Sequence, residues 1–187
     1  MKKFEPEVIE VKVEKLVHGG QGLGTLADVR KIFVWNGLPG ELVRARTIKR
    51  KRSYAEAIAE EILESSPERV TPREQNYLAT SPWQIMTFDA ENRYKKAIVE
   101  ELFKHEKVAL PDFGETVHEG GEWQYRNKME YSFWGDEEGI HLALHQRGSH
   151  GKQIVAGSAL AMPVVDAAAN AICKQLSVLN TRAGDLE

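Results

Sequence analysis

Residues 17–52 read VHGGQGLGTLADVRKIFVWNGLPGELVRARTIKRKR, a glycine-rich segment that ends in a run of basic residues. Its glycine cluster leads into a short strand-like run at 23–27. A run of β-branched and aromatic residues at 31–35 predicts a second extended segment. A tight turn at 37–40 then precedes an alternating run at 41–48. Short strands separated by glycine turns predict a small closed barrel or a sandwich.

The segments on either side of this stretch extend the same pattern. Residues 7–16 alternate between polar and apolar side chains, which predicts a half-buried strand. Residues 54–63 are either a fifth strand or a short helix, because their alanines and glutamates favour a helix. The composition changes around 65–67, so we predict a first domain over residues 1–66 and a second over 67–187.

The second domain is predicted to be α+β. Asp89 is the expected N-cap of a helix over 89–105, in which apolar side chains recur every four residues. Strands are expected within 123–155, beginning with the aromatic run at 123–133. An apolar face predicts a last helix over 163–179, and proline suits its first turn.

Composition excludes several classes of protein. The chain has 187 residues, of which 42% are hydrophobic and 28% charged, so a wholly disordered chain is excluded. No apolar run approaches the ~18 residues that a membrane span needs. No secretory signal is recognised, and the single cysteine, Cys173, excludes an internal disulfide framework. We therefore expect a cytoplasmic protein without a membrane partner.

The strongest nucleic-acid signal is a basic block in which six of nine residues are lysine or arginine. The block comprises Arg44, Arg46, Lys49, Arg50, Lys51 and Arg52. The net charge of −3 argues mildly against nucleic-acid binding, but screening limits the reach of an exposed charge, so local charge decides binding. Such a block could follow a phosphate backbone, or it could be a solvated strand edge protected from aggregation. The nearby aromatics Phe33, Trp35 and Tyr54 favour RNA, since bases stack on such rings, although they could equally be core residues.

The glycine cluster invites a nucleotide-phosphate interpretation. A dinucleotide fingerprint needs glycines that open a helix, whereas here more strand follows, so this interpretation is disfavoured. Glycines also permit the sharp bends of a small barrel. The loop could still present backbone amides and His18 to a phosphate.

A second candidate contact is the run Tyr125, Arg126, Asn127 and Lys128, which combines a ring, two cations and an amide. Its alternative is the polar outer face of a strand. The histidines His141, His145 and His150 lack a compact ligand spacing, so no metal site is predicted. Cys173 is expected to be a buried apolar residue, and no catalytic motif is recognised.

These motifs together resemble a known family. Residues 17–24 and 37–41, with the basic strand after them, resemble the TRAM domain, an OB-like five-stranded β-barrel that binds RNA. The second half resembles the central domain of bacterial 23S rRNA (uracil-5-)-methyltransferases, which carry TRAM at the N-terminus. The matching segments are 93–96, 125–129, 145–149 and 159–163.

The sequence departs from the family in two ways. Members often hold a [4Fe–4S] cluster on four cysteines, and those positions are here Glu74, Thr80, Trp83 and Ser158. None of these supplies a thiolate, so no cluster is expected, and Trp83 is expected to pack into the vacated space. The family's S-adenosylmethionine site and cysteine nucleophile belong to a later domain, before which this chain ends. Cys173 does not match that nucleophile.

The leading hypothesis is therefore the RNA-binding N-terminal part of an RNA uracil-C5 methyltransferase, inactive alone and without a cofactor of its own. Expected partners are RNA, with rRNA as the favoured class, and the missing methyltransferase domain; DNA is not expected. The alternative is a free-standing RNA-binding or RNA-chaperone module, and a protein-interaction barrel is a third reading. The predicted RNA contacts are His18, the six residues of the basic block, residues Tyr125 to Lys128, and Arg147.

Overall fold

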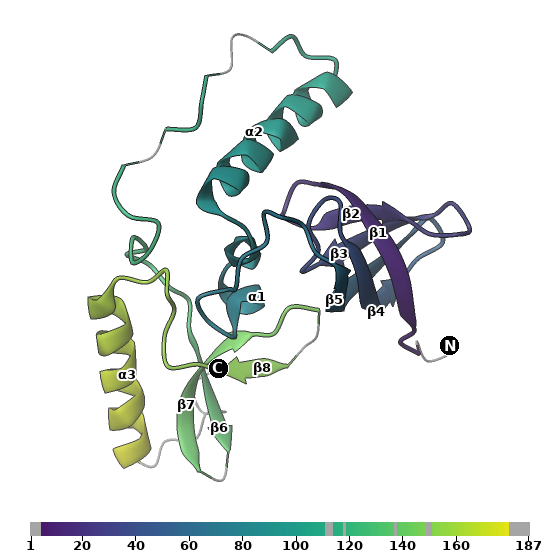
Figure 1. Ribbon diagram of the computed structural model, residues 1–187. Coiled ribbons are helices and arrows are strands. Elements are labelled where there is room, and N and C mark those ends of the chain that lie inside the picture. The colour runs from purple at the N-terminus through teal and green to yellow at the C-terminus, as the bar shows by residue number, and fades with distance from the viewer. Residues whose placement is uncertain (1–4, 111–113, 118, 137, 149–150, 180–187) are drawn as a thin grey trace. The chain divides into compact units, whose positions relative to one another are not determined.

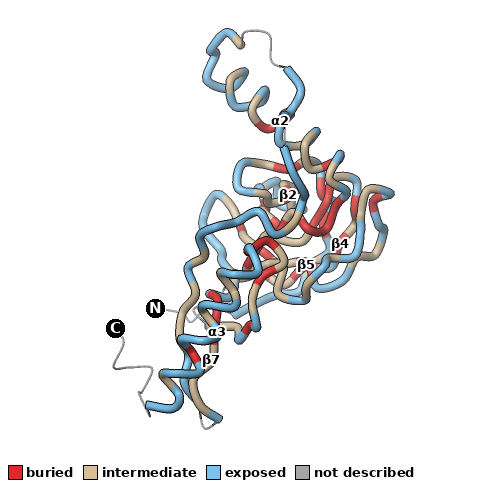
Figure 2. Tube along the Cα trace, turned by 90° about the vertical axis from the view of Figure 1, so that its left-hand side faces the viewer, coloured by how far each residue is buried: buried red, intermediate tan, exposed pale blue. Residues whose placement is uncertain are grey.

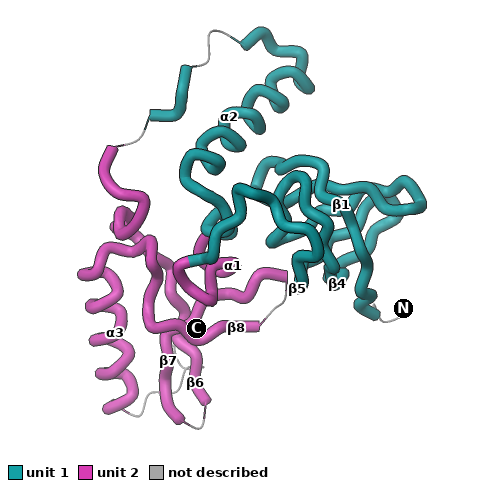
Figure 3. Tube along the Cα trace, viewed as in Figure 1, with its two compact units in different colours: residues 1–72, 82–118 teal, residues 73–81, 119–187 magenta. Residues whose placement is uncertain are grey.

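The computed structural model describes residues 5–110, 114–117, 119–136, 138–148 and 151–179 (Figure 1). The chain forms two compact units (Figure 3). Unit 1 comprises Met1–Pro72 and Pro82–His118, and unit 2 comprises Arg73–Ser81 and Glu119–Glu187. The domain boundary predicted between residues 66 and 67 stays a prediction. Ser149, part of the resemblance, and residues 180–187 lie outside the described residues.

Unit 1 contains a closed five-stranded β-barrel, which confirms the predicted fold. Its strands are β1 (Val8–Leu16), β2 (Gly22–Thr25), β3 (Lys31–Trp35), β4 (Leu42–Arg50) and β5 (Tyr54–Glu64). They follow one another around the barrel in the order β1-β2-β3-β5-β4, and β4 pairs with β1 to close it. The β3–β5 pair is parallel and the other pairs are antiparallel, so the barrel is mixed.

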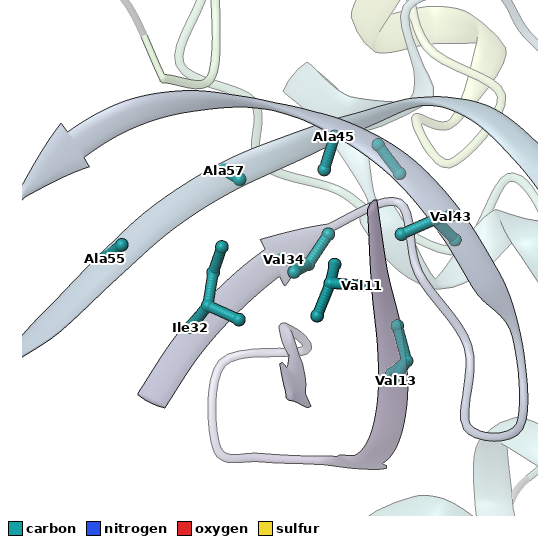
Figure 4. Close-up of a cluster of buried hydrophobic side chains, with 9 residues drawn as sticks. Val11, Val13, Ile32, Val34, Val43, Ala45, Ala55 and Ala57 are labelled. Atoms are coloured by element: carbon teal, nitrogen blue, oxygen red, sulfur yellow. The ribbon is translucent and has the colours of Figure 1, made fainter. Parts of the chain in front are cut away.

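The barrel core consists of small and β-branched side chains (Figure 4). Alternate residues of each strand point inward, as the period of two requires. The fully or nearly fully buried members are Val11, Val13, Ile32, Val34, Val43, Ala45, Ala55, Ala57 and Ala59. Because Ile32 and Val34 both lie inside, Phe33 between them lies on the outer side of β3.

Residues 54–63, for which the sequence allowed a strand or a short helix, form strand β5. Its inward positions Ala55, Ala57 and Ala59 are all buried, and Ala55 pairs across the parallel ladder with Ile32. These alanines belong to the same core cluster as the valines of the other strands. Packing in the barrel therefore overrides the helix propensity of these alanines.

The glycine cluster has two structural roles. Gly19 and Gly20 adopt φ values of 93° and 88° in the turn after β1, which glycine enters without steric cost. Gly22 instead lies within β2, where a Cβ atom would stand 2.6 Å from Cγ1 of Val13. The cluster is therefore partly a turn, as predicted, and partly a place where β2 approaches β1 too closely for a side chain.

A buried carboxylate at the end of the 37–40 turn anchors the segment that leaves the barrel. Glu41 is completely buried, and its oxygens accept hydrogen bonds from the backbone N–H groups of Leu38 (2.8 Å) and Ser66 (3.1 Å). Arg69 donates to the same carboxylate through Nε (2.6 Å) and Nη2 (2.8 Å). This paired, fully hydrogen-bonded arrangement satisfies a charge that would otherwise be costly to bury.

Unit 1 continues into a short 3-10 helix, η1 (Pro82–Ile85), and the helix α2 (Phe88–His105). The N-cap is Thr87, whose hydroxyl accepts from the N–H of Ala90 at 3.3 Å, so the prediction of Asp89 as the cap was wrong. Asp89 lies in the first turn, where a carboxylate favours the helix dipole. Only Ala90 and Ile98 of α2 are buried. Most of this helix is drawn as exposed or intermediate in Figure 2.

Unit 2 combines the short helix α1 (Tyr77–Thr80), a three-stranded antiparallel sheet and the helix α3 (Pro163–Val178). The sheet has the order β6-β7-β8, formed by Ser132–Asp136, Gly139–His145 and Lys152–Ile154. Its core contains Leu142, Leu144, Val155 and Cys173 of α3. The α+β prediction is confirmed, and α3 ends one residue before the predicted end.

The strand predicted from residue 123 was wrong at its beginning, because β6 starts only at Ser132. Gln124 has a φ of 58°, which interrupts an extended strand. Arg126 forms a single parallel bridge with Ala161 instead. Among the described residues, no helix is both long and apolar enough to cross a membrane.

Candidate nucleic-acid interface

The predicted basic block follows the outer face of β4 and continues into the turn before β5. Arg44 lies between acids of the two neighbouring strands: its Nη2 is 3.1 Å from Oε1 of Glu10, and its Nη1 contacts Glu61. The hydrogen bond with Glu10 raises the pKa of Arg44 further above its ordinary value. The charge of this first arginine is therefore compensated on both sides.

The next three cations of the block are also paired. Nε of Arg46 lies 2.6 Å from Glu60 and Nζ of Lys49 lies 2.6 Å from Glu56. Nη1 of Arg50 lies 2.7 Å from Glu7. The hydrogen bond with Glu56 raises the pKa of Lys49. Arg44, Arg46, Lys49 and Arg50 thus form exposed ion pairs across strands, and their charge is not freely available to a phosphate.

Lys51 and Arg52 differ from these four residues. Both are exposed in the turn between β4 and β5, and within the described ranges neither has a carboxylate at ion-pair distance. The N–H of Lys51 donates to the carbonyl oxygen of Tyr54 at 2.8 Å, and Nη1 of Arg30 contacts the carbonyl oxygen of Lys51 at 3.3 Å. The backbone of the turn is therefore held in place while its two charges face solvent.

An aromatic pair lies beside this turn on the outer side of the barrel. The rings of Phe33 and Tyr54 meet edge to face, with 5.7 Å between their centroids. Nζ of Lys49 lies 5.6 Å from the centroid of Tyr54. We refer to Phe33, Lys49, Lys51, Arg52 and Tyr54 as the basic corner. It combines ring faces and cations, the two groups that contact bases and phosphates of single-stranded RNA.

His18 is exposed in the turn after β1, which the N–H of Val17 closes by donating to the carbonyl oxygen of Gln21 at 2.9 Å. The antiparallel register pairs Val8 with Arg46 and Lys12 with Leu42. The end of β1 is therefore at the opposite end of the barrel from Lys51. The structure does not bring His18 and the basic corner together.

In unit 2, the predicted contact at 125–128 forms an exposed connection rather than a strand. Tyr125 is 57% exposed, and Asn127 is also exposed. Arg126 fixes the backbone: its N–H donates to the carbonyl oxygen of Leu160 (2.9 Å), and its own carbonyl accepts from Met162 (2.8 Å). The side chains at this connection are therefore presented from an anchored backbone.

A cavity of about 300 Å³ opens beside this connection. Arg126 and Lys128 line it together with Glu130, and Met129 and Leu144 supply apolar surface. Nζ of Lys128 lies 3.0 Å from Glu130, in an ion pair of which both members are largely exposed. The cavity therefore carries both cations and apolar surface, and a carboxylate offsets part of its charge.

Arg147 has a structural contact. Its Nε donates to the carbonyl oxygen of Leu78 in α1 at 2.7 Å, and burial lowers its pKa. Its guanidinium group is therefore at least partly engaged within unit 2. His141 pairs with Asp136 at 2.9 Å. The described part of the chain contains no cluster of three or more histidine, cysteine or acidic side chains suited to a metal ion.

The sequence pattern did not single out the sheet face that lies opposite α3. Phe133 and Leu142 face α3, so the alternate residues Trp134 and Ile154 lie on the other face, where they are 45% and 50% exposed. Lys152 reaches across this face to donate to the hydroxyl of Ser132 at 2.6 Å. The alternation within β6 is the signal that could have identified Trp134.

The sequence matches the TRAM domain over residues 2–59. It is 30% identical to an uncharacterized RNA methyltransferase of Halalkalibacterium halodurans, over 77% of this chain and 32% of that protein. It is 31% identical to the 23S rRNA (uracil(1939)-C(5))-methyltransferase RlmD of Chromohalobacter salexigens, over 74% of this chain and 30% of that protein. It is 29% identical to an uncharacterized RNA methyltransferase of Treponema denticola, over 83% of this chain and 42% of that protein. The chain spans about a third of the length of the first two relatives.

Proposed function

We propose that this chain binds RNA. It contains a TRAM domain, and about three quarters of its length is homologous to RNA methyltransferases, among them 23S rRNA (uracil-C5) methyltransferases. The family match carries the proposal. The substrate class is rRNA, as in the relative from Chromohalobacter salexigens. The expected compartment is the cytoplasm.

The basic corner is the proposed RNA contact of unit 1. Lys51 and Arg52 supply the charge that is not compensated within the described chain, and Phe33 and Tyr54 supply rings for stacking. Arg44, Arg46, Lys49 and Arg50 contribute less charge, because each already pairs with a glutamate. The contact is therefore narrower than the whole basic block.

In unit 2 the proposed contacts are Tyr125, Arg126, Asn127 and Lys128 beside the cavity, with Trp134 on the sheet as an added stacking group. The role proposed for this stretch of chain is to hold and orient RNA. The methyl transfer, and the S-adenosylmethionine that it consumes, are assigned to the part of the relatives that this chain does not span. His18 and Arg147 are retained as weaker candidates.

A charge-reversal experiment tests the basic corner. We compare Lys51→Glu/Arg52→Glu with Lys104→Glu/Lys107→Glu, which makes the same change in net charge near the end of α2. Binding of a fluorescein-labelled rRNA hairpin is measured by anisotropy at several salt concentrations. The first variant should bind more weakly. Its negative slope of log K against log salt should become shallower by roughly 1.4 to 1.8, the value for two lost phosphate contacts.

The control variant should keep both the affinity and the slope. Equal losses in both variants would show that only overall charge matters, and the basic corner would then be the wrong site. An unmodified chain whose affinity for RNA is weak and independent of salt would contradict RNA binding itself.

A further inference from the structure

Unit 2 brings together three of the four positions at which the family resemblance implies cluster cysteines. Glu74, Thr80 and Ser158 come from two segments of unit 2 that are far apart in sequence. The hydroxyl of Thr80 donates to Oε1 of Glu74, and the N–H of Ala159 donates to its Oε2 at 2.8 Å. One carboxylate therefore joins residue 80 to the turn that contains residue 158.

These side chains do not suit an iron–sulfur cluster. Irons of such clusters are held by thiolates, and a carboxylate with two hydroxyls offers only oxygen. Thr80 and Ser158 are 9% and 7% exposed, and both are occupied by hydrogen bonds of their own. The fourth position, Trp83, is in unit 1, where a Cβ atom on Gly20 would stand 3.0 Å from its Nε1 and Nζ of Lys95 lies 5.7 Å from its ring centroid.

The turn at 157–160 is held by side-chain oxygens at three successive backbone N–H groups. The N–H of Ser158 donates to Oδ2 of Asp166 in α3 at 3.0 Å. The N–H of Ala159 donates to Glu74, and the N–H of Leu160 donates to the hydroxyl of Ser158 at 3.2 Å. Two carboxylates and a hydroxyl thus accept from these three N–H groups of the turn.

The second carboxylate, Asp166, is itself fixed. The hydroxyl of Tyr131 donates to its Oδ1, and burial raises the pKa of Tyr131, so this hydroxyl stays protonated and able to donate. A Cβ atom on Gly157 would stand 2.3 Å from Oδ2 of Asp166. The turn therefore approaches Asp166 closely, and it does so only because residue 157 is glycine.

We infer that Glu74 replaces the iron–sulfur cluster as the link between the 74–80 segment and the 157–160 turn, while Asp166 holds the same turn from α3. Hydrogen bonds to a carboxylate then connect the two segments in place of thiolate–iron bonds, and unit 2 folds without metal. The inference rests on the family resemblance and on these contacts. It is independent of whether the basic corner binds RNA, so the two proposals fail separately.

The test compares Glu74→Ala with Glu138→Ala, which removes an exposed carboxylate of the same unit. Hydrogen exchange of the 157–160 amides is followed by mass spectrometry. Glu74→Ala should exchange roughly tenfold faster or more at this turn, because it loses a hydrogen bond to a charged acceptor. Glu138→Ala should match the unmodified chain. Equal protection in Glu74→Ala and the unmodified chain would overturn the inference.

Two further measurements keep the test decisive if Glu74→Ala does not fold. Thr80→Val removes only the hydroxyl that orients Glu74, and it too should speed exchange at Ala159; no change would count against the link. The unmodified chain is also incubated anaerobically with ferrous iron, sulfide and a thiol reductant. It should bind no iron and develop no visible absorption band, whereas stoichiometric uptake of iron with such a band would overturn the replacement.

Discussion

Replacing Glu41 with alanine should destabilise the barrel by about 3–5 kcal/mol, the usual loss when one partner of a buried ion pair is removed. The carboxylate is completely buried and accepts from four donors, namely the N–H groups of Leu38 and Ser66 and two nitrogens of Arg69. Without it, two buried N–H groups lose their acceptor, and the guanidinium of Arg69, whose side chain is only 16% exposed, keeps its hydrogen bonds to Asn36 but loses its charged partner. This loss is comparable to much of the ~5–15 kcal/mol that stabilises a typical domain.

Urea denaturation followed by far-UV circular dichroism measures the effect. A double-mutant cycle with Arg69→Met separates the ion pair from the backbone contacts. Arg69→Met should lower the free energy of unfolding less in the Glu41→Ala background than in the unmodified chain. The control is Glu64→Ala, which removes a largely exposed carboxylate paired with Lys12 and should change the midpoint little. If Glu41→Ala shifts the urea midpoint no more than the control does, the reasoning is refuted.

Three other outcomes follow from the contacts. Glu60→Gln frees Arg46 from its ion pair, so affinity for RNA at low salt should rise roughly two- to fivefold by anisotropy, while an unchanged affinity would show that Arg46 is remote from the RNA. Gly22→Ala should lower the stability by about 1–3 kcal/mol in thermal denaturation, because its Cβ would meet Val13; a neutral effect would mean that β2 can shift. Cys173 is buried and burial raises its pKa, so it should react with a thiol reagent at pH 7 only after unfolding; fast labelling of the folded chain would contradict this.

The barrel was largely predictable from the sequence because its strands obey local rules. Alternation locates β1 and β4, and the β-branched run at 31–35 gives β3 with the observed bounds. The parallel pairing of β3 with β5 was not predictable, since no local pattern records which strands become neighbours. The same gap left residues 54–63 ambiguous, because their alanines become strand residues only when they face the barrel interior.

The candidate site was harder to predict for a related reason. The basic block is visible in the sequence, but the acids that pair with Arg44 belong to β1 and β5, 34 and 17 residues away. A count of charges along the chain cannot reveal this compensation. The connection at 125–128 was misassigned as a strand because the aromatic run at 123–133 resembles one, whereas the positive φ of Gln124 redirects the backbone.

The barrel and the sheet of unit 2 differ in whether they have open strand edges. In the barrel every strand has a hydrogen-bonded neighbour on both sides, so it offers no open edge to which another chain could add a strand. The sheet of unit 2 is open, with β6 and β8 as its outer strands. Intermolecular strand addition at high concentration should therefore begin in unit 2, where the short length of β8 and its Lys152 act as safeguards against aggregation.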